Sequence, residues 1–155
     1  MAYCDSRKLC VRVFTADVLS KVVCILVFCL YPCTMKRPAD ADITGVGAWL
    51  LKIIYFFDGG EHPMNLLPSM HCYLSVMVCI PLFSRFAEKP VKRGIKVFFC
   101  VFALLICAST LFVKQHVLVD VATGVPLAPL CWWASLLIWK IYDAGKARQL
   151  PEGGN

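Results

Sequence analysis

His116 and Asp120 have the residue types and the spacing of a catalytic pair. If a helix begins near residue 115, both side chains lie on one face of it and within reach of each other. A carboxylate that accepts the hydrogen of one imidazole nitrogen fixes the tautomer and leaves the other nitrogen free to attack. The pair can therefore act as a nucleophile with its orienting group. Spacing alone equally allows a helix-capping or pore-facing histidine beside an unrelated carboxylate.

A second polar patch, Pro68-Ser69-Met70-His71, stands at the start of another apolar run. If a helix begins there, its unpaired backbone N–H groups and the positive end of its dipole favour an anion such as phosphate. A histidine in this position could protonate a leaving oxygen. The alternative is a simple Pro-Ser helix start with a histidine at the membrane interface.

Arg37-Pro38 is a third patch, located after the first apolar run. Arginine is the side chain best shaped to hold phosphate oxygens by paired hydrogen bonds. An arginine before a turn proline is common on protein surfaces, so this patch has meaning only together with the other two.

The composition indicates a membrane protein, since 59% of the 155 residues are hydrophobic and the mean hydropathy is +0.70. Such a chain has too little polar surface to cover a soluble core. Spanning about 30 Å of hydrocarbon takes about 20 residues. We therefore expect one all-α membrane domain over residues 1–155, with four spans, one interfacial or re-entrant helix and a disordered tail. The spans are expected at residues 11–31, 69–86, 94–113 and 117–141, the shorter helix at 47–57 and the tail at 144–155.

The last two spans are separated by a polar cluster, Lys114-Gln115-His116, inside a long apolar stretch. As one helix, residues 94–139 would be roughly 70 Å long, more than twice the hydrocarbon thickness. The chain is therefore expected to turn at the membrane surface at this cluster.

Basic residues predict the orientation, because the cytoplasmic side of a membrane protein is richer in Lys and Arg. With four alternating spans, one side carries Arg7, Lys8, Arg12, Arg85, Lys89, Lys92, Arg93, Lys96, Lys140, Lys146 and Arg148, and the other carries Lys36, Arg37, Lys52 and Lys114. Both termini are then cytoplasmic, and the three polar patches share the extracytoplasmic face. This asymmetry accounts for the net charge of +6 without a nucleic-acid partner.

The three patches resemble the motifs of the type 2 phosphatidic acid phosphatase superfamily, which run Lys-x6-Arg-Pro, Pro-Ser-Gly-His and Ser-Arg-x5-His-x3-Asp. The matching residues, in this order, are Arg37-Pro38, Pro68-Ser69-Met70-His71, and Ser109-Thr110 with His116 and Asp120. The resemblance covers roughly residues 17–127. Details around residues 31–38, 65–71 and 114–116 look most like the branch related to inositol phosphorylceramide synthases.

The resemblance implies a phosphatase or phosphotransferase that acts on a phosphate-containing membrane lipid. In such an enzyme, His116 would form a phosphohistidine, Asp120 would orient His116, and His71 would serve as general acid and then as general base. The phosphoryl oxygens would be held by Arg37, Ser69 and Ser109, with Lys114 as a further cation. No metal or other cofactor is implied, and the oligomeric state is left open.

The sequence departs from the family motifs at three positions. Leu30 stands where the first motif has lysine, Met70 replaces glycine, and Thr110 replaces the arginine of the third motif. Lys114 is close enough in sequence to Thr110 to supply the missing charge. Four spans instead of the family's usual six suggest a missing N-terminal portion or a reduced variant.

Two other classes of function stay open. An inactive or truncated relative could serve as a membrane binding or assembly protein, and a small transporter could line a path with polar residues. A transporter tends to carry charges through the membrane depth, as Asp17 and Lys21 do in the first span. These two are four apart, so a mutual ion pair is expected, with substrate contact as the alternative.

Overall fold

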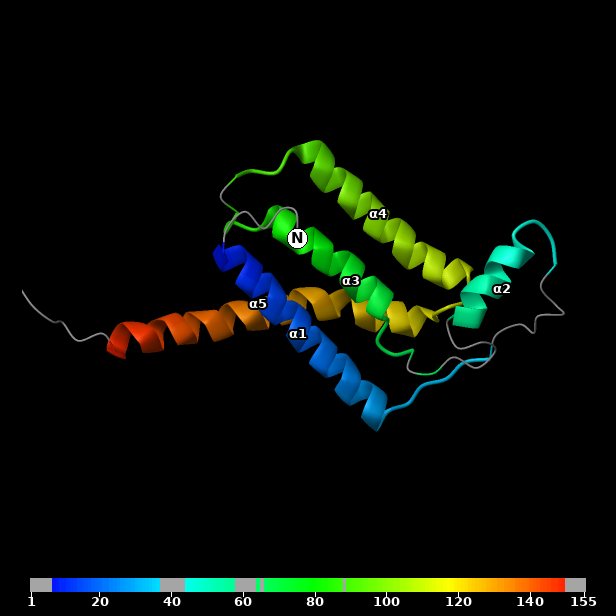
Figure 1. The fold of residues 1–155 in the computed structure, drawn as a ribbon, viewed down its shortest axis with the longest axis horizontal. Coiled ribbons are helices and arrows are strands. Elements are labelled where there is room, and N and C mark those ends of the chain that lie inside the picture. The colour runs from blue at the N-terminus through cyan, green and yellow to red at the C-terminus, as the bar shows by residue number, and fades with distance from the viewer. Residues whose placement is uncertain (1–6, 37–43, 58–63, 65, 88, 150–155) are drawn as a thin grey trace, which may run out of the picture.

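The computed structural model describes residues 7–36, 44–57, 64, 66–87 and 89–149. They form five α-helices and one short 3₁₀ helix, and no named strand (Figure 1). The elements are α1 (Arg7–Leu30), α2 (Ala48–Phe57), α3 (Met70–Cys79), η2 (Ile80–Phe83), α4 (Arg93–Phe112) and α5 (Leu118–Gln149). The expectation of an all-helical domain is confirmed for the described residues.

Three helices, α1, α4 and α5, are long and apolar enough to cross a membrane. The span expected at residues 69–86 is shorter than expected, because α3 ends at Cys79 and the chain tightens into η2. Pro81 explains this end, since proline has no N–H to donate to the preceding turn. Together α3 and η2 rise only about 23 Å, short of the hydrocarbon thickness of about 30 Å. The fourth expected span is therefore not confirmed.

The predicted break between the last two long helices is confirmed, because α4 ends at Phe112 and α5 begins at Leu118. The tail expected to be disordered from residue 144 is instead part of α5 as far as Gln149. Its residues 144–149 are strong helix formers apart from Gly145, which explains the continuation. Residues 150–155 lie outside the described part of the chain.

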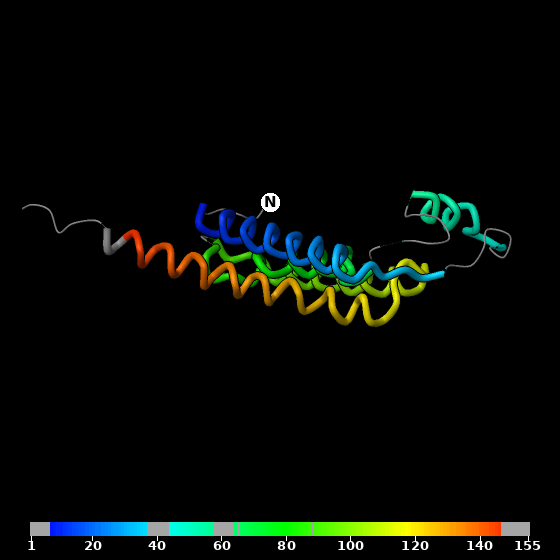
Figure 2. Tube along the Cα trace, turned by 90° about the horizontal axis from the view of Figure 1, so that it is seen from below, coloured from blue at the N-terminus to red at the C-terminus, as the bar shows by residue number. Residues whose placement is uncertain are grey.

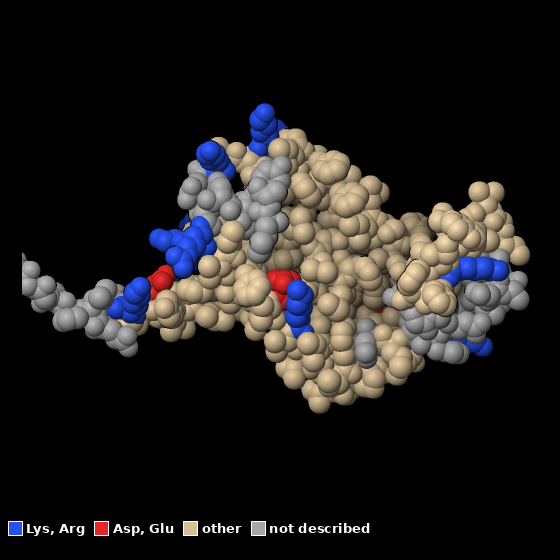
Figure 3. All heavy atoms as spheres, viewed as in Figure 1, with Lys and Arg blue, Asp and Glu red and all other residues tan. Residues whose placement is uncertain are grey.

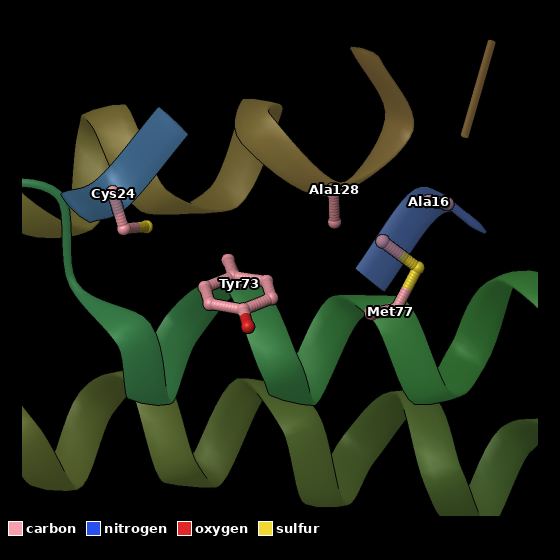
Figure 4. Packing of buried hydrophobic residues seen from close by; sticks show 5 residues of the cluster. All are labelled: Ala16, Cys24, Tyr73, Met77 and Ala128. Carbon is pink, nitrogen blue, oxygen red and sulfur yellow. The ribbon is translucent and has the colours of Figure 1, made fainter. Parts of the chain in front are cut away.

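The short helix α3 is the centre of the bundle, packed between α4 and α5 and touching α1 (Figure 1). Its Tyr73 and Met77 lie in the core with Ala16, Cys24 and Ala128 (Figure 4). The buried positions of α1 and α5 are mostly small residues, which let helix backbones approach closely in a membrane. They are Ala16, Ser20 and Cys24 in α1 and Gly124, Ala128, Cys131 and Ser135 in α5.

The starts of α3 and α5 and the end of α4 lie at one end of the bundle (Figure 1), and the tube view shows the long helices lying side by side (Figure 2). The starts of α1 and α4 and the end of α5 lie toward the other end. Uncharged residues dominate the visible face between the two ends, as Figure 3 shows. This distribution fits an integral membrane protein.

The expected ion pair in α1 is present. Lys21 Nζ lies 2.6 Å from Asp17 Oδ2, and the other carboxylate oxygen accepts a hydrogen bond of 3.4 Å from the hydroxyl of Tyr73. Asp17 therefore joins α1 to the central helix α3. A second contact joins α1 to α5, because the indole N–H of Trp139 donates to Thr15 Oγ1 at 3.0 Å.

Replacing Lys21 by methionine should lower the free energy of unfolding by about 1 kcal/mol, because it leaves the Asp17 carboxylate without its cation in an apolar helix. The double variant Asp17→Asn/Lys21→Met should recover part of this loss, since asparagine still accepts the Tyr73 hydrogen bond. Thermal unfolding in detergent measures both. A double variant less stable than Lys21→Met alone would contradict this account of the pair.

Candidate active site

The start of α3 is built by Ser69, whose Oγ accepts a hydrogen bond from the backbone N–H of Cys72 at 3.3 Å. Serine is one of the best residues for this capping position, because its side chain satisfies an N–H group that the helix leaves unpaired. The backbone N–H of Ser69 itself donates to the carbonyl oxygen of Asp120 at 3.1 Å. The first turn of α5 and the first turn of α3 are thereby joined directly.

This contact needs Gly124. A Cβ atom at Gly124 would lie 2.6 Å from the Ser69 carbonyl oxygen and 3.3 Å from Cys72 Cβ. Since real Cβ atoms essentially never come closer than 3.0 Å, only glycine lets α5 pass so near the backbone at the start of α3. Gly124 lies one helical turn after Asp120, on the same face.

The turn that carries His116 is held by the last turn of α4. The carbonyl oxygen of Thr110 accepts the backbone N–H groups of Gln115 and His116, at 2.9 and 3.2 Å. Lys114 has a positive φ of 53° and donates its N–H to Leu111. These bonds form a Schellman motif, in which glycine usually takes the left-handed position that lysine has here. The motif reverses the chain sharply and directs His116 toward the start of α3.

The side chains of His71, His116 and Asp120 lie in contact with one another in this order. Nδ1 of His116 lies 3.3 Å from Oδ2 of Asp120, and Nε2 of His116 lies 3.4 Å from Nδ1 of His71. The same Oδ2 accepts the backbone N–H of Val117 at 3.0 Å, which holds the carboxylate in place. His116 and Asp120 are buried, whereas His71 is exposed.

The geometry assigns the tautomers. A carboxylate only accepts hydrogen bonds, so Nδ1 of His116 carries its hydrogen toward Asp120, and Nε2 presents a lone pair. His71 then directs its Nδ1–H at that lone pair. In this arrangement, Nε2 of His116 is not engaged by the carboxylate and lies against the exposed ring of His71.

Two helix starts converge at this point, since His71 lies in the first turn of α3 and His116 lies two residues before α5. Unpaired N–H groups and the positive dipole ends of two helices favour an anion there. Among the described residues, no group of three or more His, Cys, Asp or Glu side chains is placed to hold a metal ion.

The residues predicted to bind phosphate differ in their burial and in their contacts. Ser69 is fully buried next to the site, and its Oγ caps α3. Ser109 is exposed in the last turns of α4, with its hydroxyl donating to Ile106. Lys114 is exposed in the turn before His116.

Arg37 lies outside the described residues. The backbone of nearby Thr34 pairs with that of Met64, which precedes α3. The contacts of Arg37, Ser69, Ser109 and Lys114 with phosphate stay predictions.

Thr110, which stands where the family motif has arginine, is buried and does not face solvent. Its hydroxyl donates to the carbonyl of Cys107 at 2.9 Å and lies 3.9 Å from Cys72 Sγ. Its part in the site is the backbone carbonyl that holds Gln115 and His116.

Two residues that the sequence analysis missed support the site. Gly124 is the first, and its signal was a glycine one turn after Asp120 inside an apolar helix. Tyr55 of α2 is the second: it is 5% exposed, and its hydroxyl donates to the Val113 carbonyl at 2.8 Å. No local pattern predicts that contact, because it joins segments 58 residues apart.

Residues 8–143 match the PAP2 superfamily, so the chain belongs to this superfamily. The match runs from α1 into α5 and includes His71, His116 and Asp120. No curated protein is detectably similar to the chain. No solved structure is detectably similar to it either. Membership indicates a phosphatase or phosphotransferase of lipid phosphates in an integral membrane protein.

Gly124→Ala should lower both activity and thermal stability, because the new methyl group would push the Ser69 backbone away from Asp120. We expect a loss of at least about 1 kcal/mol in unfolding free energy, as for other overpacked sites. Gly145→Ala in the same helix is the matched control, since a Cβ there meets nothing within 4 Å. Equal behaviour of the two variants in thermal unfolding and turnover would contradict the close contact.

Proposed function

We propose that this chain transfers the phosphoryl group of a membrane lipid through a phosphohistidine on His116. The contact series from His71 through His116 to Asp120 carries this proposal. It supports a nucleophile, an orienting carboxylate and a neighbouring proton donor at the meeting point of two helix starts. The superfamily match supports the class of substrate, a lipid that carries a phosphate group.

In the first step, Nε2 of His116 attacks phosphorus, and the bond from phosphorus to the leaving oxygen breaks. His71 gives the leaving oxygen a proton, so that the product departs as an alcohol. The positive charge that develops on the His116 ring is stabilised by Asp120 at 3.3 Å. Because His71 and His116 are in direct contact without substrate, the incoming phosphoryl group must separate them.

In the second step, a hydroxyl compound loses its proton to His71 and attacks phosphorus, and the bond from nitrogen to phosphorus breaks. Water as the acceptor makes the chain a hydrolase, and an inositol or lipid hydroxyl makes it a transferase. Placement of His71 at the exposed side of the site suits it for accepting the proton and releasing it to water.

Phosphoryl transfer depends mainly on positioning and on neutralising the charge of the transferred group. Arg37, Lys114, Ser69 and Ser109 are the residues we propose for this task, together with the N–H groups at the start of α3. Lys114 would take the place of the arginine that Thr110 replaces. The basic residues at the opposite end of the bundle favour a cytoplasmic location for that end and an extracytoplasmic site.

A second candidate function is that of an inactive relative that binds lipid phosphates or assists assembly in the membrane. The buried Thr110 favours this candidate, because its side chain cannot supply the positive charge of an arginine. An activity assay separates the two functions, since a binding protein would hold lipid phosphates without turnover.

His71→Ala should lower turnover of phosphatidic acid by roughly 10²–10⁴, the range for loss of a general acid. Its loss on p-nitrophenyl phosphate should be much smaller, because nitrophenolate leaves without protonation. His116→Ala should abolish both reactions, since the nucleophile is removed. Purified full-length protein is assayed with both substrates. Leu74→Ala, on an exposed position of α3, is the control for damage to that helix.

Full activity of His116→Ala would rule out the phosphohistidine mechanism. Equal losses of His71→Ala on the two substrates would exclude His71 as the proton donor to the leaving oxygen. Binding without any turnover by the unaltered chain would favour the inactive relative.

A further inference from the structure

The peptide group that joins Val113 to Lys114 is held at both of its ends. Its carbonyl oxygen accepts a hydrogen bond of 2.8 Å from Tyr55 Oη, and its N–H donates to the carbonyl oxygen of Leu111 at 3.1 Å. Because a peptide group is planar, its orientation is tied to ψ of the residue before it and to φ of the residue after it. The hydroxyl of Tyr55 therefore restrains the backbone angle φ at Lys114.

That backbone angle is unfavourable for a lysine. Lys114 has a φ of 53° and is the one non-glycine residue with a positive φ in the part of the chain that the structure describes. A residue with a Cβ atom is strained in this left-handed conformation and stays there only when its surroundings hold it. The bonds to Leu111 and Thr110 come from within the turn itself, whereas Tyr55 adds a restraint from 58 residues before Val113.

The surroundings of Tyr55 suit it for this contact. It is 5% exposed and is the only buried residue of α2, which lies at the end of the bundle where α4 ends and α5 begins (Figure 1). A buried tyrosine hydroxyl needs a hydrogen-bond partner, and a carbonyl at the end of a helix has none within its helix. The bond between Tyr55 and Val113 satisfies both groups and joins α2 to the start of the turn.

The conformation of Lys114 determines where His116 lies. Only Gln115 separates the two residues, and the ring of His116 lies 3.3 Å from Asp120 and 3.4 Å from His71. Both distances are long for hydrogen bonds, so a small rotation of the turn would break these contacts. Misplacing a reacting group by about 1 Å can cost about a hundredfold in rate.

We propose that Tyr55 is a positioning residue of the transfer reaction. Its hydrogen bond to Val113 stabilises the left-handed conformation of Lys114 and thereby keeps the ring of His116 between Asp120 and His71. Tyr55 acts through the turn and not by contact with the phosphoryl group. The effect on rate rests on the proposed phosphoryl transfer, whereas the effect on the turn does not.

The first test is Tyr55→Phe in the full chain, which removes only the hydroxyl. With phosphatidic acid in mixed micelles, it should lower kcat about tenfold and change KM less than about twofold, because it displaces the nucleophile and leaves lipid binding intact. Tyr142→Phe is the matched control, since it removes the same atom from an exposed position of α5 and should keep full activity. Equal kcat values for the two variants would overturn the inference.

A double-mutant comparison tests whether Tyr55 acts through Lys114. Lys114→Ala and Lys114→Gly both remove the ammonium group and lower activity for that reason, but only glycine takes a positive φ without strain. Tyr55→Phe should therefore lower kcat about tenfold in the Lys114→Ala background and less than about twofold in the Lys114→Gly background. If Tyr55 only held α2 against the bundle, the two losses would be equal, and the inference would be overturned.

A third measurement does not depend on turnover. Nitrogen NMR signals of the histidine rings report which nitrogen carries the hydrogen, and the signals of His116 are those missing from His116→Ala. The unaltered chain should show one His116 tautomer, with its hydrogen on Nδ1. Tyr55→Phe should give a mixture of the two tautomers, and Tyr55→Phe/Lys114→Gly should return the single one.

These outcomes distinguish a failure of this inference from a failure of the proposed function. If the unaltered chain turns over neither phosphatidic acid nor p-nitrophenyl phosphate while Tyr55→Phe mixes the His116 tautomers, phosphoryl transfer fails and the positioning role of Tyr55 stands. A single His116 tautomer in every variant would overturn the inference.

Discussion

The site depends on one close backbone contact, between the start of α3 and the first turn of α5. The Ser69 N–H reaches the carbonyl oxygen of Asp120 at 3.1 Å, and the missing side chain of Gly124 leaves room for it. Small buried residues along α1 and α5 likewise let the helix backbones lie close together through the bundle. Because two helix starts meet in this way, His71 and His116 face each other and both dipoles direct their positive ends at one point.

The two histidines have different surroundings, which suit the different roles that we propose for them. His116 is buried, and the Asp120 carboxylate, itself held by the Val117 N–H, fixes its tautomer. His71 is exposed, so that its ring can exchange protons with water. A nucleophile needs a fixed orientation, and an acid that must later act as a base needs access to solvent. The arrangement supplies both within a single contact of 3.4 Å.

Local sequence patterns were sufficient to predict the helical class, the break before His116, and the pairs His116–Asp120 and Asp17–Lys21. Each of these follows from hydropathy or from four-residue spacing. The span over residues 69–86 was overestimated because hydropathy does not register how Pro81 ends α3. The contacts of Tyr55 with Val113 and of Gly124 with Ser69 depend on tertiary packing. Spacing along the chain cannot specify such contacts.

The most direct test of the account is to locate the phosphoryl group on the enzyme. The chain is mixed with a phosphate ester, denatured rapidly in alkali, where phosphohistidine survives, and digested for mass spectrometry. The account predicts one acid-labile phosphoryl group on Nε2 of His116. Turnover with a phosphoryl group on another residue, or with none on the enzyme, would contradict it.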